Sequence, residues 1–378
     1  MASRPDILWI VTTQWRAQAC GYAGDVNART PALDALASAA GIVNYAQAVT
    51  PHPFGPFARA AMLTGVPSPE NGVRDYWDAL PRDAKTVAHA LGERGYATAF
   101  FGKWGVGERD RAAPLVGEAA ARVAVPREAR GGFGWWTGFE GGFLLNDPWL
   151  QGDGVENGEA RVRGYQSDVV CGRAAEWLAR EAAGRPRFMV VSLEAPHPPY
   201  DSATPVGVSR IHPGDVVLAA DVPRGGEVEA RARRELAGYY AHIAATDAAI
   251  GRLLARVGAG TVVVFTSVHG DMHGSHGLFR KGWPHEESVR VPLLVRGAPG
   301  AGAATRRSDE AVSLVDLPAM ALAWSEGLAW SGAREKAEIS MPCVVDLPHQ
   351  CDRVWRGWRS ATEKRVWIQD GAEWALGE

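Results

Sequence analysis

The sequence predicts an α/β protein with a mostly parallel central sheet, helices on both faces of that sheet, and a small antiparallel subdomain at the carboxyl end. Three observations lead to this fold. Short apolar runs of strand length alternate with longer amphipathic stretches. The 378 residues are 46% hydrophobic and 22% charged, which is enough for a sizeable core. Residues 354–367 alternate aromatic and basic side chains. The composition excludes a disordered chain, a collagen-like fibre and a small disulfide-stapled scaffold.

The alternation of strands and helices can be followed along most of the chain. The expected elements are strand 7–11, helix 31–40, helix 84–94, strand 96–101, helix 166–183, strand 188–193, helix 227–257, strand 261–266 and strand 292–296. Thr30 is a candidate N-cap for the first helix, and Pro31 suits its first turn. Gly95 is placed to end the second helix. This order predicts parallel strands, with ligands bound beyond their carboxyl ends.

Two segments interrupt this pattern and are expected to be long ordered loops over a site. Residues 130–154 are rich in Gly, Trp and Phe, and residues 202–226 are rich in Pro and Gly. The aromatic and basic alternation near the carboxyl end predicts one or two antiparallel strands. We therefore expect an α/β domain at 1–335 and a small antiparallel subdomain at 336–378 packed on it.

Charge and hydropathy exclude several classes of protein. Forty basic and 43 acidic side chains give a net charge of −3, so no basic field for nucleic acid is expected. The apolar runs are far shorter than the roughly 20 residues that span a bilayer. The chain enters its first strand at once with no evident cleavable leader, so a cytoplasmic protein is expected. The four cysteines lack a Cys-x-x-Cys spacing and give no support for a zinc site or a disulfide framework.

A series of short segments, in order along nearly the whole chain, resembles the sulfatase family of the alkaline phosphatase superfamily. They are TTQWR at 12–16, GYAG at 21–24, TPALD at 30–34, RAAMLTG at 59–65, GKW at 102–104, APHPP at 195–199, YYA at 239–241, HGDM at 269–272, SHG at 275–277, Lys281 and VPLL at 291–294. The resemblance implies the sulfatase and alkaline-phosphatase-like fold, which agrees with the alternation of elements.

The resemblance also implies a division of labour in the site. In the family, a Cys or Ser of a Cys/Ser-x-Pro-x-Arg motif becomes formylglycine, whose hydrate attacks sulfur or phosphorus. A divalent metal, usually calcium, is held by aspartates and an Asn or His. Lysines and histidines bind the ester oxygens and assist the leaving group. A dianionic centre needs such concentrated positive charge and an activated nucleophile.

This sequence departs from the family pattern at four functional positions. Thr13 and Val268 stand where the family has metal-binding aspartates, and Gly105 replaces the histidine that follows Gly-Lys-Trp. The nucleophile position is occupied by Phe54 if the segment is aligned on Gly-Pro-Phe, or by Gly55 if it is aligned on the following arginine. Neither residue can be oxidised to formylglycine, so the attacking group of the family is lost.

The loss of carboxylates changes what the pocket is expected to bind. Calcium prefers six to eight oxygen ligands, and only His269 and Gln14 would remain beside it, so we predict no bound metal and no cofactor. Removing a divalent ion with two carboxylates leaves the formal charge roughly unchanged. Arg59, Lys103 and Lys281 are then expected to make a cationic, anion-binding pocket, with Gln14 as a further binding residue.

Histidines and aromatic residues complete the predicted site. His197 and His269 are candidate acid/base groups because the imidazole pKa lies near neutrality, although His269 is equally well a hydrogen-bonded remnant. Trp15, Phe54 and Trp104 lie in motif segments and are expected to line the pocket. A hydrophobic or aromatic ligand with one anionic group is therefore expected.

Three functions are compatible with this pattern. The first is a sulfatase-like protein with a degenerate site that binds a small anion, alone, as a homo-oligomer or paired with an active homologue. The second is a metal-independent repurposed enzyme, of specialised metabolism for example. The third is a genuine sulfate or phosphate ester hydrolase with another nucleophile, such as Thr13 or Thr50. The sequence leaves open which is correct, and it identifies neither ligand nor oligomeric state. No membrane or nucleic-acid partner is expected.

Overall fold

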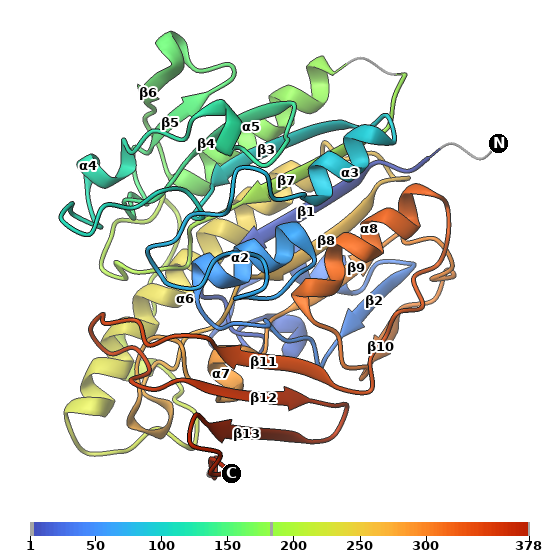
Figure 1. Ribbon diagram of the computed structural model, residues 1–378. Coiled ribbons are helices and arrows are strands. Elements are labelled where there is room, and N and C mark those ends of the chain that lie inside the picture. The colour runs from blue at the N-terminus through green and yellow to red at the C-terminus, as the bar shows by residue number, and fades with distance from the viewer. Residues whose placement is uncertain (1–3, 182–183, 377–378) are drawn as a thin grey trace.

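The structure is a computed structural model that describes residues 4–181 and 184–376 (Figure 1). Its strands are β1 Ile7–Thr12, β2 Ile42–Tyr45, β3 Ala97–Lys103, β4 Trp135–Phe139, β5 Trp149–Gly152, β6 Glu159–Arg161, β7 Arg187–Ser192, β8 Val262–Ser267, β9 Leu293–Arg296, β10 Arg306–Ser308, β11 Ala337–Met341, β12 Trp355–Arg359 and β13 Lys364–Ile368. Its α-helices are α1 Pro31–Ala37, α2 Gly55–Thr64, α3 Val87–Glu93, α4 Glu118–Ala121, α5 Gln166–Arg180, α6 Glu227–Leu254, α7 Glu286–Val289 and α8 Leu317–Ser325.

A ten-stranded mixed sheet forms the centre of the molecule. Its order is β10-β2-β9-β8-β1-β7-β3-β4-β5-β6. The five central strands from β8 to β4 are parallel. Antiparallel pairs occur on both sides of them, where β9 runs against β8 and β2, and where β5 runs against β4 and β6. The parallel centre therefore brings the carboxyl ends of β8, β1, β7, β3 and β4 to one edge.

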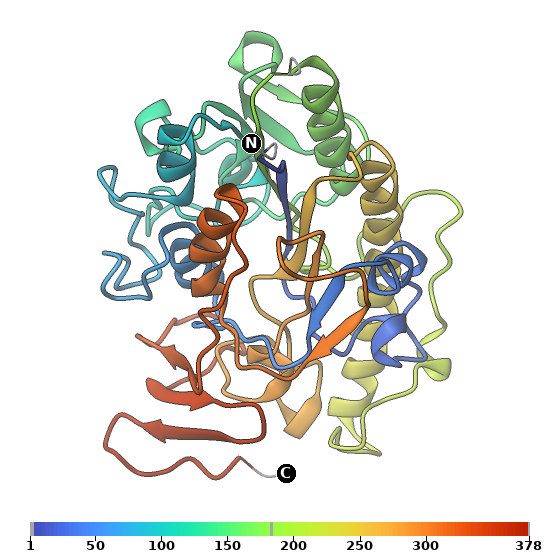
Figure 2. The same ribbon diagram turned by 90° about the vertical axis from the view of Figure 1, so that its right-hand side faces the viewer.

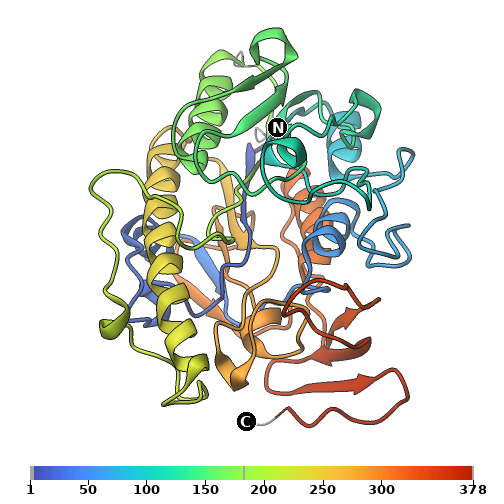
Figure 3. The ribbon, with the colours of Figure 1, turned by 90° about the vertical axis from the view of Figure 1, so that its left-hand side faces the viewer.

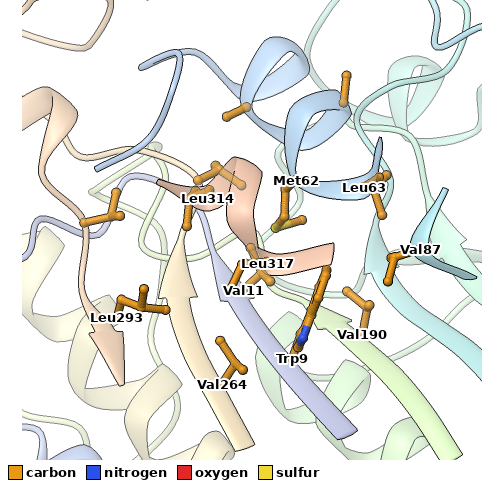
Figure 4. Close-up of a cluster of buried hydrophobic side chains, with 14 of the residues drawn as sticks. Trp9, Val11, Met62, Leu63, Val87, Val190, Val264, Leu293, Leu314 and Leu317 are labelled. Atoms are coloured by element: carbon orange, nitrogen blue, oxygen red, sulfur yellow. The ribbon is translucent and has the colours of Figure 1, made fainter. Parts of the chain in front are cut away.

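Helices cover both faces of the sheet (Figure 2). On one face, α2, α3 and α8 contribute side chains to one hydrophobic core; on the other, α1, α5 and α6 contribute to a second. Side chains along β1 alternate between these cores: Trp9 and Val11 enter the first, whereas Leu8 and Ile10 enter the second. Figure 4 shows Trp9 and Val11 beside Met62 of α2. A strand that is apolar on both sides is typical of a buried parallel sheet.

The predicted fold class is confirmed, with corrections in detail. The strand expected at 292–296 forms as β9, but it is antiparallel to its neighbours. The segment 130–154, expected to be a loop, contributes β4 and β5, because its Trp- and Phe-rich part packs as an extension of the sheet. The segment 202–226 has no strand and one short 3-10 turn. The end of the helix expected at 166–183 lies partly outside the described residues.

The first helix is capped differently from the prediction. The Thr30 side chain does not cap α1; its hydroxyl accepts from the Gly21 N–H and donates to Asp34. Instead the carboxylate of Asp247, on α6, accepts the N–H groups of Ala32 and Leu33 at 2.9 Å each. A buried carboxylate at a helix N-terminus satisfies free donors and complements the helix dipole. This contact fixes α1 against α6.

A three-stranded antiparallel sheet, in the order β11-β12-β13, lies at the carboxyl end of the described chain. Ile339, Met341 and Trp355 of this sheet belong to the same core as α2 and α8. The Trp355 indole also donates to the Gly282 carbonyl at 2.7 Å. The predicted boundary at 335/336 falls just before β11. None of the described helices is long and apolar enough to traverse a membrane, and all four cysteines are free thiols.

Gly102, the penultimate residue of β3, lies where the parallel strands β3 and β7 pack closely. Its φ is +97°, and a Cβ built on it would lie 2.1 Å from the Ser192 carbonyl oxygen of β7. We expect Gly102→Ala to lower the free energy of unfolding by about 2–3 kcal/mol, through backbone strain and overpacking. Urea denaturation measures this change. Gly172→Ala in α5, with open space around it, is the control and is expected to be neutral or stabilising.

Candidate functional site

A cavity of about 270 Å³ opens at the carboxyl ends of the parallel strands. Figure 3 views the molecule from the side toward which β1 runs in Figure 1. Residues at the end of β3 or after β1, β7 and β8 contribute polar side chains to the cavity or to its immediate surroundings. They are Thr13, Gln14, Lys103, Glu194, His197 and His269. This position agrees with the general rule for ligand sites of open α/β sheets.

Arg59, on α2, holds three strand ends together beneath the cavity. Its guanidinium donates to the Lys103 carbonyl at 3.1 Å, the Ser192 hydroxyl at 2.6 Å and the Thr13 hydroxyl at 2.8 Å. Burial lowers the pKa of Arg59 to about 10, so the group stays charged at neutral pH. Its Nε–H has no partner among the described residues. This Nε is buried, and a Cβ built on Gly105 would lie 3.1 Å from it.

Lys103, at the end of β3, forms a buried ion pair with Glu194, which follows β7. Burial lowers the pKa of Lys103, and Glu194 opposes that shift. The second carboxylate oxygen of Glu194 has no partner in the described parts of the chain. The Lys103 ammonium also lies 4.6 Å from the centre of the Phe143 ring. The positive charge of Lys103, which the sequence predicts to bind an anion, is therefore largely neutralised by Glu194.

Lys281 enters the cavity from a loop after β8 and is held by neutral groups. Its Nζ donates to Gln14 Oε1 at 2.7 Å and lies 3.3 Å from His197 Nε2. Asp271 fixes the Gln14 amide, because a carboxylate can only accept from the Gln14 NH₂ group. Burial would raise the pKa of Asp271, but His273, Arg280 and the Tyr200 hydroxyl keep it well below its usual value. Burial lowers the pKa of Lys281 to about 7.

Both candidate histidines line the cavity, and in each ring Nδ1 faces a backbone carbonyl. His197 Nδ1 lies 2.8 Å from the Pro198 carbonyl, and His269 Nδ1 lies 2.8 Å from the Gly270 carbonyl. A carbonyl accepts, so each neutral ring carries its proton on Nδ1 and has a lone pair on Nε2. Burial, reinforced by Lys281, lowers the pKa of both histidines well below the ordinary value. At neutral pH both rings are therefore acceptors.

The first residue of α2 faces His269. Gly55 opens the helix one turn before Arg59, and a Cβ built on it would lie 4.0 Å from His269 Nε2. That nitrogen is buried and has no hydrogen-bond partner within the described residues. Phe54, at the N-cap, also lines the cavity, and the centre of its ring lies 5.2 Å from the Lys281 ammonium. The two neighbouring residues thus form an apolar floor without a nucleophilic side chain.

Carboxylates neutralise more of the positive charge around the pocket than the sequence indicates. Ion pairs link Lys103 with Glu194, Arg109 with Glu140 at 2.9 Å, and Arg280 with Glu235 at 2.6 Å. Over residues 4–181 and 184–376, neither Arg59 nor Lys281 forms an ion pair. The expected grouping of Arg59, Lys103 and Lys281 is present, since all three line one cavity. Their uncompensated charge, however, comes from Arg59 and Lys281.

The donor set does not fit a calcium ion. Thr13 Oγ1 donates to the Leu193 carbonyl at 3.0 Å and accepts from Arg59. Gln14 Oε1 accepts from Lys281. Val268 is part of the hydrophobic core. The remaining His269 nitrogen supplies one ligand where calcium needs six to eight oxygens, and two cations already reach the same region.

A different group of metal-ligand side chains lies outside the cavity. Ligand atoms of Asp221, His276 and Glu287 lie within 4.8 Å of one another. His276 Nε2 and Asp221 Oδ2, which are 3.3 Å apart, form an ion pair when the imidazole is protonated.

Two of the aromatic residues expected in the pocket lie elsewhere. Trp15 packs edge-on against Phe265 in one core, and its indole donates to the Ala19 carbonyl at 2.9 Å. Trp104 packs against Phe100 and other rings in the opposite core. Both side chains are buried in these cores. Of the three, only Phe54 lines the cavity.

Several residues in or beside the cavity escape sequence reasoning. Glu194 lies two residues after β7 and three residues before the motif histidine His197, but a single acidic residue there does not by itself indicate a buried ion pair. Phe143 stacks on the His197 ring, with centres 4.4 Å apart and planes 2° apart, but it comes from a Gly-rich loop without a distinguishing pattern. The outer wall is mostly apolar and comes from two segments distant in sequence. It includes Ala113, Pro114, Leu115, Val116, Ala120, Val123, Leu347 and Pro348.

The fold and the cavity define an α/β protein with a partly cationic pocket at the carboxyl ends of a parallel sheet. The chain belongs to the sulfatase family of the alkaline phosphatase superfamily: the family model described as Sulfatase matches residues 5–328. The resemblance seen in the sequence is thereby confirmed.

Known relatives agree with this membership. The chain is 37% identical to an ulvan-active sulfatase of Formosa agariphila over 306 residues, covering 78% of this chain and 56% of that protein. It is 26% identical to an arylsulfatase of Clostridium perfringens, covering 94% of this chain and 80% of the relative. The chain thus spans little more than half the length of the ulvan-active protein.

Solved structures share the fold. The sulfatase-like yidJ protein of Bacteroides fragilis superimposes with a TM-score of 0.82 at 21% identity, covering 97% of this chain and 86% of that one. A phosphonate monoester hydrolase of Agrobacterium radiobacter gives a TM-score of 0.68 at 19% identity, covering 97% and 90%. At these identities the likeness concerns the fold alone.

Proposed function

We propose that this chain binds a small molecule with an anionic group in the cavity and does not cleave sulfate esters by the formylglycine and calcium route. The observation that carries the proposal is Gly55. In the register set by Arg59, it occupies the position of the family's nucleophile, at the first residue of α2. Glycine has no side chain to oxidise, and no Cys or Ser occurs between Ala39 and Val66.

The hydroxyl groups that could replace the nucleophile are engaged elsewhere. Thr13 donates its hydroxyl proton to the Leu193 carbonyl and accepts from Arg59, so neither histidine can take that proton in this arrangement. The Thr50 hydroxyl donates to the His52 carbonyl at 2.9 Å and is not part of the cavity wall. An activated nucleophile needs a base within hydrogen-bond reach, and both threonines lack one.

Anion binding is supported by two cations without a carboxylate partner. Arg59 lines the cavity with its Nε–H buried beside Gly105 and without a hydrogen-bond partner among the described residues, and the Lys281 ammonium lies 5.2 Å from the centre of the Phe54 ring. The outer wall is mostly apolar, although Glu108 and Asp110 also line the cavity. A ligand with one anionic group and a hydrophobic or aromatic body complements this distribution. The same pocket, with His197 or His269 as base, also suits the metal-independent enzyme considered above.

Binding can be measured with 4-methylbenzenesulfonate, a stable anion that resembles an aryl sulfate. Isothermal titration is expected to give one site per chain, and Lys281→Met is expected to weaken binding at least about tenfold, as the loss of a charged hydrogen bond implies. Lys336→Met, at an exposed position, is the matched control and should bind normally. Absence of binding by the wild-type chain, or equal binding by Lys281→Met, would refute the proposal.

One observation favours a second candidate, a genuine ester hydrolase: the 37% identity to an ulvan-active sulfatase. Metal analysis and turnover separate the two. We expect the purified chain to contain no stoichiometric calcium and to leave 4-nitrophenyl sulfate and phosphate intact, with a melting temperature unaffected by EDTA. One calcium per chain, together with hydrolysis that EDTA abolishes, would establish the second candidate instead.

A further inference from the structure

The five lysines of the chain differ sharply in their surroundings. Lys85 and Lys336 are exposed. Lys103 is paired with Glu194, and Lys364 with Glu286 at 2.8 Å. Lys281 is 7% exposed and lines the cavity, yet it forms no ion pair with any described residue. A buried amine without a counter-charge is the usual environment of a nucleophilic lysine.

The hydrogen bonds of Lys281 leave its nitrogen free on one side. A neutral amine has two N–H groups and one lone pair. Gln14 Oε1 and the bare His197 Nε2 are both acceptors, at 2.7 Å and 3.3 Å, and can take the two N–H groups. Asp271 prevents the Gln14 amide from turning its NH₂ group toward Lys281. The lone pair is therefore left for a group bound in the cavity.

We propose that Lys281 is a nucleophile that forms an imine with an aldehyde or ketone on the bound anionic molecule. This inference rests on the proposed function, since it names the reactive group of the ligand that the same pocket binds. Arg59 lines the same cavity and retains its charge when Lys281 is neutral, so its guanidinium can attract the anionic group while the amine reacts.

The reaction balances with the groups present. The Lys281 nitrogen attacks the carbonyl carbon, the C=O π electrons pass to oxygen, and a proton moves from nitrogen to that oxygen to give a carbinolamine. His197 Nε2, 3.3 Å from the amine, is placed to carry this proton. Loss of the hydroxyl as water, with the second amine proton, forms the C=N bond. Both hydrogens of the water come from the amine, and no oxidant or metal is required.

Electrostatics favour Lys281 over the other lysines as the amine that reacts. Burial lowers its pKa to about 7; Asp271 and Glu194 oppose this shift, whereas Lys103 and Arg280 add to it. About half of the amine is then neutral at pH 7, whereas an ordinary lysine with a pKa near 10.4 is almost fully protonated. Lys103, which faces the same cavity, forms an ion pair with Glu194 and serves as an internal comparison.

Reductive trapping tests the inference directly. The full chain is incubated with 4-formylbenzenesulfonate and cyanoborohydride at pH 7, and modified peptides are identified by mass spectrometry. We expect one adduct at Lys281, formed at least about tenfold faster than adducts at Lys85 and Lys336, given the difference in neutral amine. Lys281→Arg should lose this adduct, and Lys336→Arg should keep it. Because the wild-type peptides report the site themselves, the result does not depend on the folding of a variant.

The outcomes separate this inference from the proposed function. Equal labelling of Lys85, Lys281 and Lys336 would overturn the nucleophile. Binding of 4-methylbenzenesulfonate without an adduct at Lys281 would overturn the imine and leave anion binding intact. Absence of sulfonate binding would overturn the proposed function and this inference together.

Discussion

Glu194→Ala is expected to be the most destabilising single substitution in the pocket. The change leaves the Lys103 ammonium buried without its counter-charge, beside Arg59. Breaking one side of a buried ion pair costs about 3–5 kcal/mol. Urea denaturation should show this loss in the free energy of unfolding.

A double substitution distinguishes lost pairing from lost packing. Lys103→Met combined with Glu194→Leu removes both charges and keeps the volume, so it should recover most of the stability, as apolar replacements of buried pairs often do. Glu128→Ala, whose carboxylate forms an exposed ion pair with Arg82, is the surface control, with an expected change within about 1 kcal/mol. A double variant as unstable as Glu194→Ala would show that the ion pair is not the source of the effect.

Binding of a sulfonate is expected to weaken as pH rises through neutrality. The ammonium form of Lys281 attracts an anion, and the pKa of this group is about 7, mainly because of burial. Below pH 7 the charged form predominates and affinity is at its maximum. Above pH 7 affinity should fall by about tenfold per pH unit, because the neutral amine of Lys281 must take up a proton before it can attract the anion. Titration calorimetry between pH 6 and about pH 9 measures this slope.

The groups around Lys281 make this assignment specific. His197 and His269 have pKa values well below neutrality because of burial, and Asp271 is ionised throughout the range. Arg280 and Arg59 stay protonated, and Glu194 is paired with Lys103. Lys281→Arg keeps a charge at all these pH values, so its binding should be nearly independent of pH. A wild-type affinity that is flat from pH 6 to about pH 9 would contradict the assignment.

The sequence contains most of the information that determines the fold. Apolar runs such as residues 7–11 are continuous because both faces of β1 are buried, and that signal is local. The direction of β9 is not local. It depends on contacts with β8 and β2, which are distant in the chain, and the alternation of apolar residues gives no sign of these contacts.

The candidate site could be predicted in position but not in charge. Lys103, Lys281 and both histidines were expected in one pocket because they follow strands within family motifs. Glu194 changes the electrostatics, yet a single acidic residue after a strand is indistinguishable from a solvated one until its neighbours are known. The loop residue Phe143 is hidden for the same reason.

The position of the small sheet couples the carboxyl end of the chain to ligand entry. The connection between β11 and β12 supplies Leu347 and Pro348 to the cavity rim, while Trp355 anchors that connection to the backbone of Gly282, next to Lys281. An insertion or deletion in this connection would reshape the entrance without touching the parallel strands. Differences in this connection would let relatives that share the fold bind molecules of different size and polarity.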